Sequence, residues 1–171
     1  MSLEVFYKRV SVRRYKPDPV PDDLITKILE AAFQSPSAGN IQPWHVYVVK
    51  DKGLKERIAT CALNQSFIME APVVFVVCAI PEKSASVYGK RGEQLYCIQD
   101  TSAVTMSILL ASTALGLGSC WVGAFDEHLL RATLQTPKGF IPVAIVPIGY
   151  PQVSTRKPPK MSVTKACTYL L

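Results

Sequence analysis

The chain has 171 residues, of which 49% are hydrophobic and 19% are charged. This length is typical of one domain, and the high apolar content excludes intrinsic disorder because such a chain can bury a full core. The ordinary spread of Gly, Pro and Leu also excludes collagen-like, coiled-coil and low-complexity proteins. We therefore expect residues 1–171 to form a single domain.

The net charge of +6 is concentrated toward the two ends of the chain. Five cations lie between Lys8 and Lys16 and six follow His128, without an acidic residue in either segment, whereas the remainder has 8 cations and 13 acids. Three interpretations are open: a solvated basic face, a nucleic-acid surface, or a pocket where both ends bind one phosphate. The basic segments contain few aromatic residues and match no nucleic-acid module, which disfavours the second.

In the first half of the chain, apolar residues between Leu24 and Phe33 recur at the helical period, and Asp22 or Asp23 is expected to cap that helix. Pro17, Pro19 and Pro21 exclude a regular helix before it. The elements expected here are a short helix over 4–9, an extended segment over 9–15, a helix from 22 to 34, a loop over 35–43, a strand over 44–49 and a helix over 54–63.

In the second half, residues 72–80 are continuously apolar, which is typical of a strand covered on both faces. Residues 81–93 are polar and contain glycine, so we expect a loop that could act as a lid. The other elements expected are a long helix over 95–115, a strand over 120–124, a helix over 127–134, a strand over 143–148 and an irregular segment after 150. This order favours an α+β fold, a three-layer α-β-α sandwich.

Several chemistries are excluded by the residues that the sequence lacks. The five cysteines lie at least 17 positions apart, so there is no C-x-x-C pair, and we expect reduced core thiols in a cytoplasmic protein. Only two histidines are present, so we expect no metal site, and His45 is expected to be a strand residue rather than a base. The uncharged stretch 101–125 contains Gly116 and Gly118, which favours a buried helix and turn over a membrane span.

Three separated segments share a pattern with one family: R-V-S-V-R-R-Y at 9–15, S-P-S-A-G-N-I-Q-P-W at 35–44 and G-L-G-S-C-W-V-G-A-F at 116–125. In this order and spacing, they resemble the FMN-dependent nitroreductase family, from about residue 5 to Arg156. The resemblance implies a single FMN-binding domain with a mixed, mainly antiparallel sheet of about four or five strands. It also implies a homodimer whose flavin pockets draw residues from both chains.

The resemblance implies that both ends of the chain bind the FMN phosphate. Arg9 corresponds to the arginine that binds this phosphate, and Ser11 to a polar neighbour. Val10 lies where the backbone passes the cofactor, and Arg13 corresponds to a cation that reaches the pyrimidine edge of the ring. Arg156 corresponds to a basic residue that closes on the same phosphate from the C-terminal side.

The second and third segments are implied to lie against the flavin ring. Asn40 and Gln42 would donate or accept hydrogen bonds at the polar ring edge. In the third segment a backbone amide faces the flavin N5 atom, and Gly123 permits the close approach. The remaining positions that the resemblance places beside the ring are Pro36, Ser37, Ala38, Val122 and Ala124.

The implied activity is that of a cytoplasmic FMN-dependent NAD(P)H oxidoreductase. NAD(P)H would pass hydride to flavin N5 and leave, after which a nitroaromatic or quinone-like small molecule would be reduced in the same place. This ping-pong scheme requires no catalytic side chain, and we expect neither a nucleic-acid nor a membrane partner. Two alternatives stay open: a flavin-cleaving or reductively dehalogenating relative of the same fold, and a non-catalytic flavin- or nucleic-acid-binding module.

Overall fold

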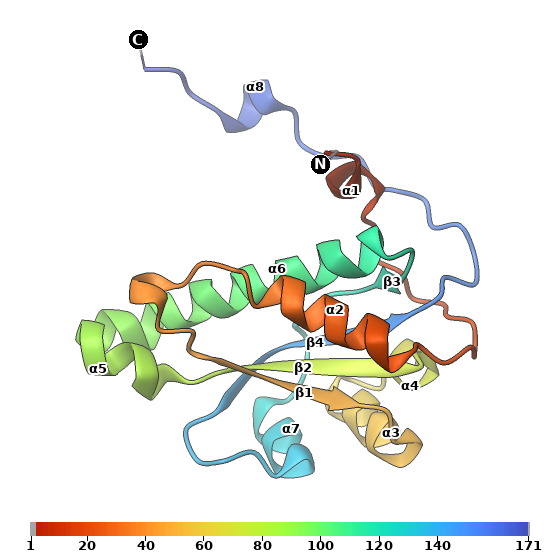
Figure 1. Cartoon of the computed structure of the whole chain (residues 1–171), viewed down its shortest axis with the longest axis horizontal. Helices are drawn as coiled ribbons and strands as arrows, with labels where there is room; N and C mark the ends of the chain where they lie inside the picture. The colour runs from red at the N-terminus through yellow and green to blue at the C-terminus, as the bar shows by residue number, and fades with distance from the viewer. Residues whose placement is uncertain (1–2, 171) are drawn as a thin grey trace.

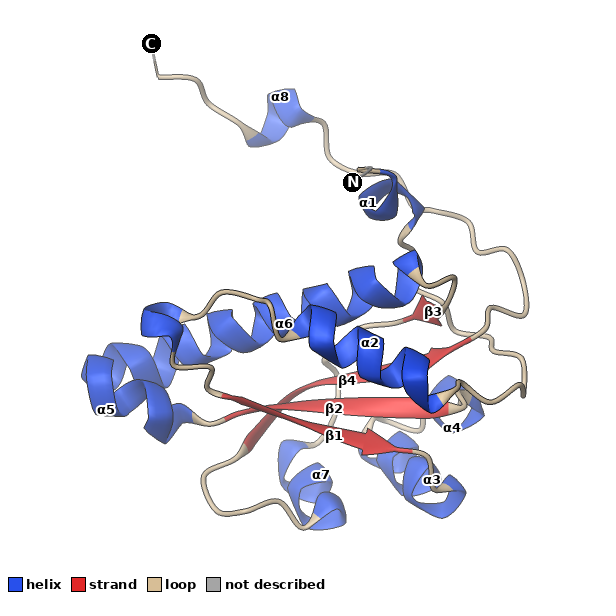
Figure 2. Ribbon diagram, viewed as in Figure 1, coloured by secondary structure: helices blue, strands red, loops and turns tan. Residues whose placement is uncertain are grey.

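The computed structural model describes residues 3–170, which form a four-stranded sheet between two layers of helices (Figures 1 and 2). The strand order is β1-β2-β4-β3 and these strands pair antiparallel, while an isolated bridge between Ser11 and Ser119 is parallel. The expected α+β sandwich is therefore confirmed. The strands are β1 (Trp44–Val49), β2 (Val73–Ala79), β3 (Gly118–Ser119) and β4 (Ile141–Gly149).

The central strand β2 is buried along its whole length because helices cover both of its faces. Side chains of successive strand residues point to opposite faces. Val74 and Val76 pack with helices of the lower layer, and Val73 and Phe75 with those of the upper layer (Figure 2). The lower layer contains α3 (Lys52–Cys61), α4 (Phe67–Glu70) and α7 (Glu127–Leu134), and the upper layer contains α2 (Asp22–Ala32) and α6 (Cys97–Ala114).

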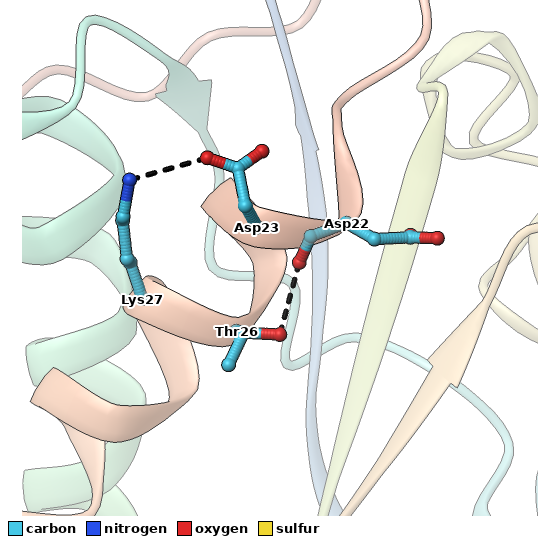
Figure 3. A network of polar contacts seen from close by, with 4 residues as sticks. All are labelled: Asp22, Asp23, Thr26 and Lys27. Atoms are coloured by element: carbon cyan, nitrogen blue, oxygen red, sulfur yellow. Dashed lines mark hydrogen bonds and ion pairs between the residues drawn. The ribbon is translucent and has the colours of Figure 1, made fainter.

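The start of α2 differs from the expectation that an aspartate caps it. Pro21 occupies the capping position, where it accepts no side-chain hydrogen bond, and Asp22 and Asp23 lie in the first turn. Figure 3 shows the side-chain contacts that result: Thr26 Oγ1 donates to the Asp22 carbonyl oxygen at 2.9 Å, and Lys27 Nζ pairs with Asp23 Oδ2 at 3.1 Å. Carboxylates in a first turn are favoured by the positive end of the helix dipole.

The expectation of a loop over 81–93 is wrong. Residues Pro81–Arg91 form helix α5, and Gly92–Tyr96 form a π-helix, η2. Pro81 suits the first position of a helix, where the missing N–H is not needed. The helix depends on tertiary contact rather than on an apolar stripe: an added Cβ at Gly92 would overlap the Ser84 carbonyl oxygen, so α5 packs directly on η2.

The strand expected over 120–124 is also displaced. Strand β3 ends at Ser119, and Val122 forms only an isolated bridge with Ile145 of β4. The carbonyl of Ser119 accepts the N–H of Val12 at 3.0 Å, so the extended segment 9–15 lies along the outer side of β3. The expected loop 35–43 is largely confirmed and contains one short 3-10 helix, η1 (Ala38–Asn40).

The two ends of the chain lie on the same side of the molecule (Figure 1). Helix α1 (Glu4–Lys8) confirms the expected opening helix, and Lys157 Nζ donates to the Tyr7 carbonyl oxygen. Beyond this contact, residues 157–170 extend away from the sandwich with exposed side chains and include the short helix α8 (Val163–Ala166).

Three further expectations from the sequence concern membrane spans, the cysteines and His45. The uncharged stretch 101–125 forms most of the half-buried α6 and the segment that follows it. None of the described helices is long and apolar enough to cross a membrane. Four cysteines are buried free thiols, whereas Cys167 is exposed, so the expectation of core burial fails for that one. His45 lies in β1 as expected, with its ring 4.7 Å from that of Tyr47.

Candidate functional site

A basic cavity of about 180 Å³ lies where the two ends of the chain meet. The sequence contributes one wall through the segment after α1 and the other through the segment after β4. Within residues 3–170, the lining contains no acidic side chain. The lining residues are Arg9, Val10, Ser11, Arg13, Thr155, Arg156, Lys157, Pro158 and Lys160.

The segment 9–15 buries two of its residues in the core and leaves its polar residues to line this cavity. Val12 and Tyr15 are buried, and the Tyr15 hydroxyl donates to the Val12 carbonyl oxygen at 2.6 Å. Ser11 is half-buried and Arg13 is exposed, and both line the cavity. Burial raises the pKa of the Tyr15 phenol well above its usual range, so this hydroxyl stays protonated as the donor.

The chemistry of the cavity suits a phosphate group. Guanidinium groups donate hydrogen bonds in pairs to phosphate oxygens, and Arg9 and Arg156 supply two of them from opposite walls. Arg13 adds a third positive charge to the lining. Positive charge and several hydrogen-bond donors are what a doubly charged anion would satisfy.

The third sequence segment continues from this cavity. Val122 exchanges both backbone hydrogen bonds with Ile145, at 2.9 and 3.0 Å, and so fixes the backbone at Gly123 and Ala124. A Cβ added at Gly123 would meet nothing within 4 Å, whereas one at Gly118 would lie 2.7 Å from Val12. The protein's own packing therefore requires glycine at 118 but leaves open space at 123.

The second sequence segment forms a loop with its own hydrogen bonds. Ser37 Oγ accepts the backbone N–H of Gln42 at 2.9 Å, and Gln42 Nε2 donates to Asn40 Oδ1 at 3.2 Å. Gly39, Asn40 and Gln42 have positive φ angles of 58°, 55° and 53°. The side chains of Asn40 and Gln42 are exposed.

This loop lies at the opposite end of α6 from the basic cavity. Ala38 N–H donates to Asp100 Oδ1 at 3.2 Å, in the first turn of α6, whereas β3 and the segment 9–15 lie beyond its last turn (Figure 1). The 18 residues of α6 correspond to about 27 Å at the usual helical rise. The described chain therefore brings Arg9, Val10, Ser11, Arg13 and Arg156 together around one cavity. It keeps the predicted loop residues, Pro36, Ser37, Ala38, Asn40 and Gln42, apart from them. The predicted residues Val122, Gly123 and Ala124 do not line this cavity.

Sequence reasoning missed some lining residues and one supporting carboxyl. Lys157 and Lys160 belong to the same basic run as Arg156, and this run was the available signal. Asp100 is only 7% exposed and holds the loop through Ala38, but a single acidic residue in an apolar helix gave no signal of this role.

The sequence profile of the nitroreductase family matches residues 7–65 and 59–150 of the chain. The chain belongs to the nitroreductase family. Similar proteins include an NADH dehydrogenase of Thermus thermophilus, 37% identical, with 84% of this chain and 83% of the relative covered. An FMN reductase [NAD(P)H] of Bacillus subtilis is 28% identical, with 94% and 71% covered.

The fold of this nitroreductase family member is also found in solved structures. A nitroreductase family protein from Clostridium novyi NT superimposes with a TM-score of 0.81 and 31% identity, covering 89% of this chain and 86% of the other. The match covers most of both chains, so the architecture is that of the family.

Proposed function

We propose that this family member binds FMN and uses NAD(P)H to reduce nitroaromatic or quinone-like small molecules. Family membership makes the chain an NAD(P)H-dependent oxidoreductase. The observation that carries the choice of FMN is the basic cavity, in which Arg9 and Ser11 from one end of the chain meet Arg156 from the other. The name of the Bacillus subtilis relative, an FMN reductase, supports the same choice.

The residues present fit the chemistry of FMN. Arg9, Ser11 and Arg156 would hold the phosphate dianion through charge-assisted hydrogen bonds. Arg13, whose guanidinium lies 5.8 Å from the centre of the Phe67 ring, would place positive charge toward the flavin edge. The open space at Gly123 would let a backbone amide approach a ring without a side chain between them. Bound FMN would supply the redox chemistry, accepting hydride from NAD(P)H and reducing the acceptor.

We also propose that the site is completed by a second copy of the chain. The loop 36–42 lies too far from the basic cavity to contact a ring whose phosphate occupies that cavity, so this loop would reach the flavin of a second copy. An apolar groove of about 560 Å³ between α1, α2 and α6 and the exposed apolar residues Val163, Tyr169 and Leu170 of the extended tail are surfaces that a partner would cover.

Sedimentation velocity of the full chain at micromolar concentration tests this assembly. We expect the mass of a dimer, with flavin absorbance sedimenting at the same rate. A monomer that carries one FMN per chain would contradict the shared site.

Substitution of Arg9 tests the phosphate assignment. Loss of a charged hydrogen-bond donor at an anion costs about 1.5–3 kcal/mol, so Arg9→Ala is expected to weaken FMN binding about 10- to 100-fold. Arg14→Ala is the matched control, because Arg14 is exposed and does not line the cavity. Fluorescence titration of apoprotein with FMN measures both affinities.

The result that contradicts the proposal is full flavin occupancy of Arg9→Ala at low FMN. A wild-type protein that is colourless and does not bind added FMN would reject the cofactor itself. Steady oxidation of NAD(P)H with a nitroaromatic or quinone acceptor separates the proposed activity from flavin cleavage and from reductive dehalogenation.

A further inference from the structure

Helix α5 contacts the loop that we propose to lie against the flavin. A Cβ added at Gly39 would lie 2.7 Å from Tyr88 Oη, so the Tyr88 hydroxyl lies directly over the loop backbone. Gly39 also has a φ of +58°, a conformation that favours glycine. The contact places α5 beside the second sequence segment.

Two aromatic rings and an arginine are grouped on this side of α5. The rings of Tyr88 and Tyr96 meet edge to face with their centres 5.2 Å apart. Arg91 Nε donates to the Tyr96 hydroxyl at 2.9 Å, and its guanidinium carbon lies 5.3 Å from the Tyr96 ring centre. Arg91 is exposed and forms no ion pair within residues 3–170, so its charge is available to a ligand.

The backbone holds this group in a defined arrangement. Gly89 adopts φ +54° and ψ −142°, a conformation that only glycine adopts without strain, and so bends the chain between Tyr88 and Arg91. The following π-helix carries Tyr96, and Gly92 packs against the backbone of Ser84. Side chains on such a tightly packed turn are suited to recognise a ligand of fixed shape, and π-helical turns are frequent at functional sites.

We propose that Tyr88, Arg91 and Tyr96 form the acceptor-binding cap of the enzyme and select planar aromatic acceptors that carry a carboxylate. The phenol rings would contact the aromatic face of the acceptor, and the guanidinium would donate to its carboxylate. This inference rests on the proposed function, because the loop beneath Tyr88 must line a flavin for the cap to face the site of reduction.

The FMN-loaded enzyme is assayed with 4-nitrobenzoate and with nitrobenzene, which differ by the carboxylate alone. An exposed charge pair contributes up to about fivefold in affinity, so Arg91→Gln is expected to raise the KM for 4-nitrobenzoate about three- to fivefold. The KM for nitrobenzene and the affinity for FMN are expected to stay unchanged. Lys90→Gln, which removes the neighbouring exposed charge, should change neither KM.

A binding measurement without turnover complements the kinetics. Benzoate is titrated into the oxidised FMN-loaded enzyme, and its dissociation constant is read from the change in flavin absorbance. Arg91→Gln is expected to raise this constant by the same factor. Tyr88→Leu should weaken binding of benzoate about tenfold through loss of the ring, whereas Tyr88→Phe should retain most of it.

The outcomes separate the cap from the proposed function. A wild-type chain that does not bind FMN rejects the function. Normal FMN binding, with the same ratio of KM values for the two acceptors in wild type and Arg91→Gln, rejects the cap alone. An effect of Arg91→Gln that is confined to the KM for NADPH also rejects it, because the charge would then serve the electron donor. Arg91 is exposed, so its substitution remains informative even if Tyr88→Leu does not fold.

Discussion

Asp100 combines burial with incomplete hydrogen bonding. Its Oδ1 accepts the N–H of Ala38, while its Oδ2 has no hydrogen-bond partner in the described chain. Burial raises the pKa of this carboxyl, and the hydrogen bond from Ala38 opposes that rise in part. The residue therefore positions the loop 36–42 at a cost to the free energy of folding when the carboxylate is charged.

Asp100→Asn is expected to increase stability at neutral pH. The pKa is higher in the folded chain than in the unfolded chain, so the folded state binds more protons between the two values and the wild type loses stability as pH rises through that interval. Asparagine keeps an oxygen for Ala38 and carries no charge. A gain of about 1–2 kcal/mol at pH 7, or about 3–6 °C in Tm, is expected.

Calorimetry of both proteins at several pH values from acidic to neutral checks this prediction. The gain should shrink toward the acidic end. Asp126→Asn is the control, because Asp126 Oδ1 caps α7 by accepting the Leu129 N–H, and asparagine caps equally well. A wild type that is more stable than Asp100→Asn at pH 7 would show that the buried carboxylate has a partner.

Among the elements, α5 shows where sequence patterns fail and why. Strand β2 was predictable because residues 72–80 are continuously apolar, and α6 because a long, mostly apolar stretch there contains a single charged residue. Helix α5 lacks such a pattern, and its residues are helical because Pro81 begins the helix and Gly92 allows close packing on Ser84. The contact between Gly92 and Ser84 is possible because the chain reverses its direction at Gly89, where φ is positive. Local helix propensity does not predict such a reversal.

Gly89→Ala tests the importance of that reversal. A side chain at φ +54° and ψ −142° costs about 1–3 kcal/mol in backbone strain, so the free energy of unfolding should fall by this amount. Gly53→Ala in α3 is the matched control, since its added Cβ would make only ordinary contacts at 3.6 Å or beyond. That substitution is expected to stabilise the chain by about 0.5–1 kcal/mol.

Urea unfolding at one fixed protein concentration measures both variants. Equal midpoints for Gly89→Ala and wild type would mean that the reversal can relax without loss, and α5 would then not be held as described.

For the whole molecule, the sequence indicated the components of the site better than their arrangement. The charge asymmetry allowed a shared anion pocket as one of three interpretations, and the family resemblance favoured it. The structure brings Arg9 and Arg156 around one cavity. The resemblance placed the loop containing Asn40 at the same cofactor, whereas the described chain keeps this loop at the far end of α6. Short sequence segments show which residue types match a family but not how far apart the fold places them within one chain.

The basic cavity and the loop 36–42 lie at opposite ends of α6, and this separation has a consequence for handling the enzyme. In the proposed arrangement, flavin retention and subunit association are thermodynamically linked, since each favours the state that the other requires. Dilution should release cofactor and subunits together, and excess FMN should oppose both. Assays at nanomolar enzyme therefore need supplementary FMN, because mass action alone would otherwise make the enzyme seem inactive.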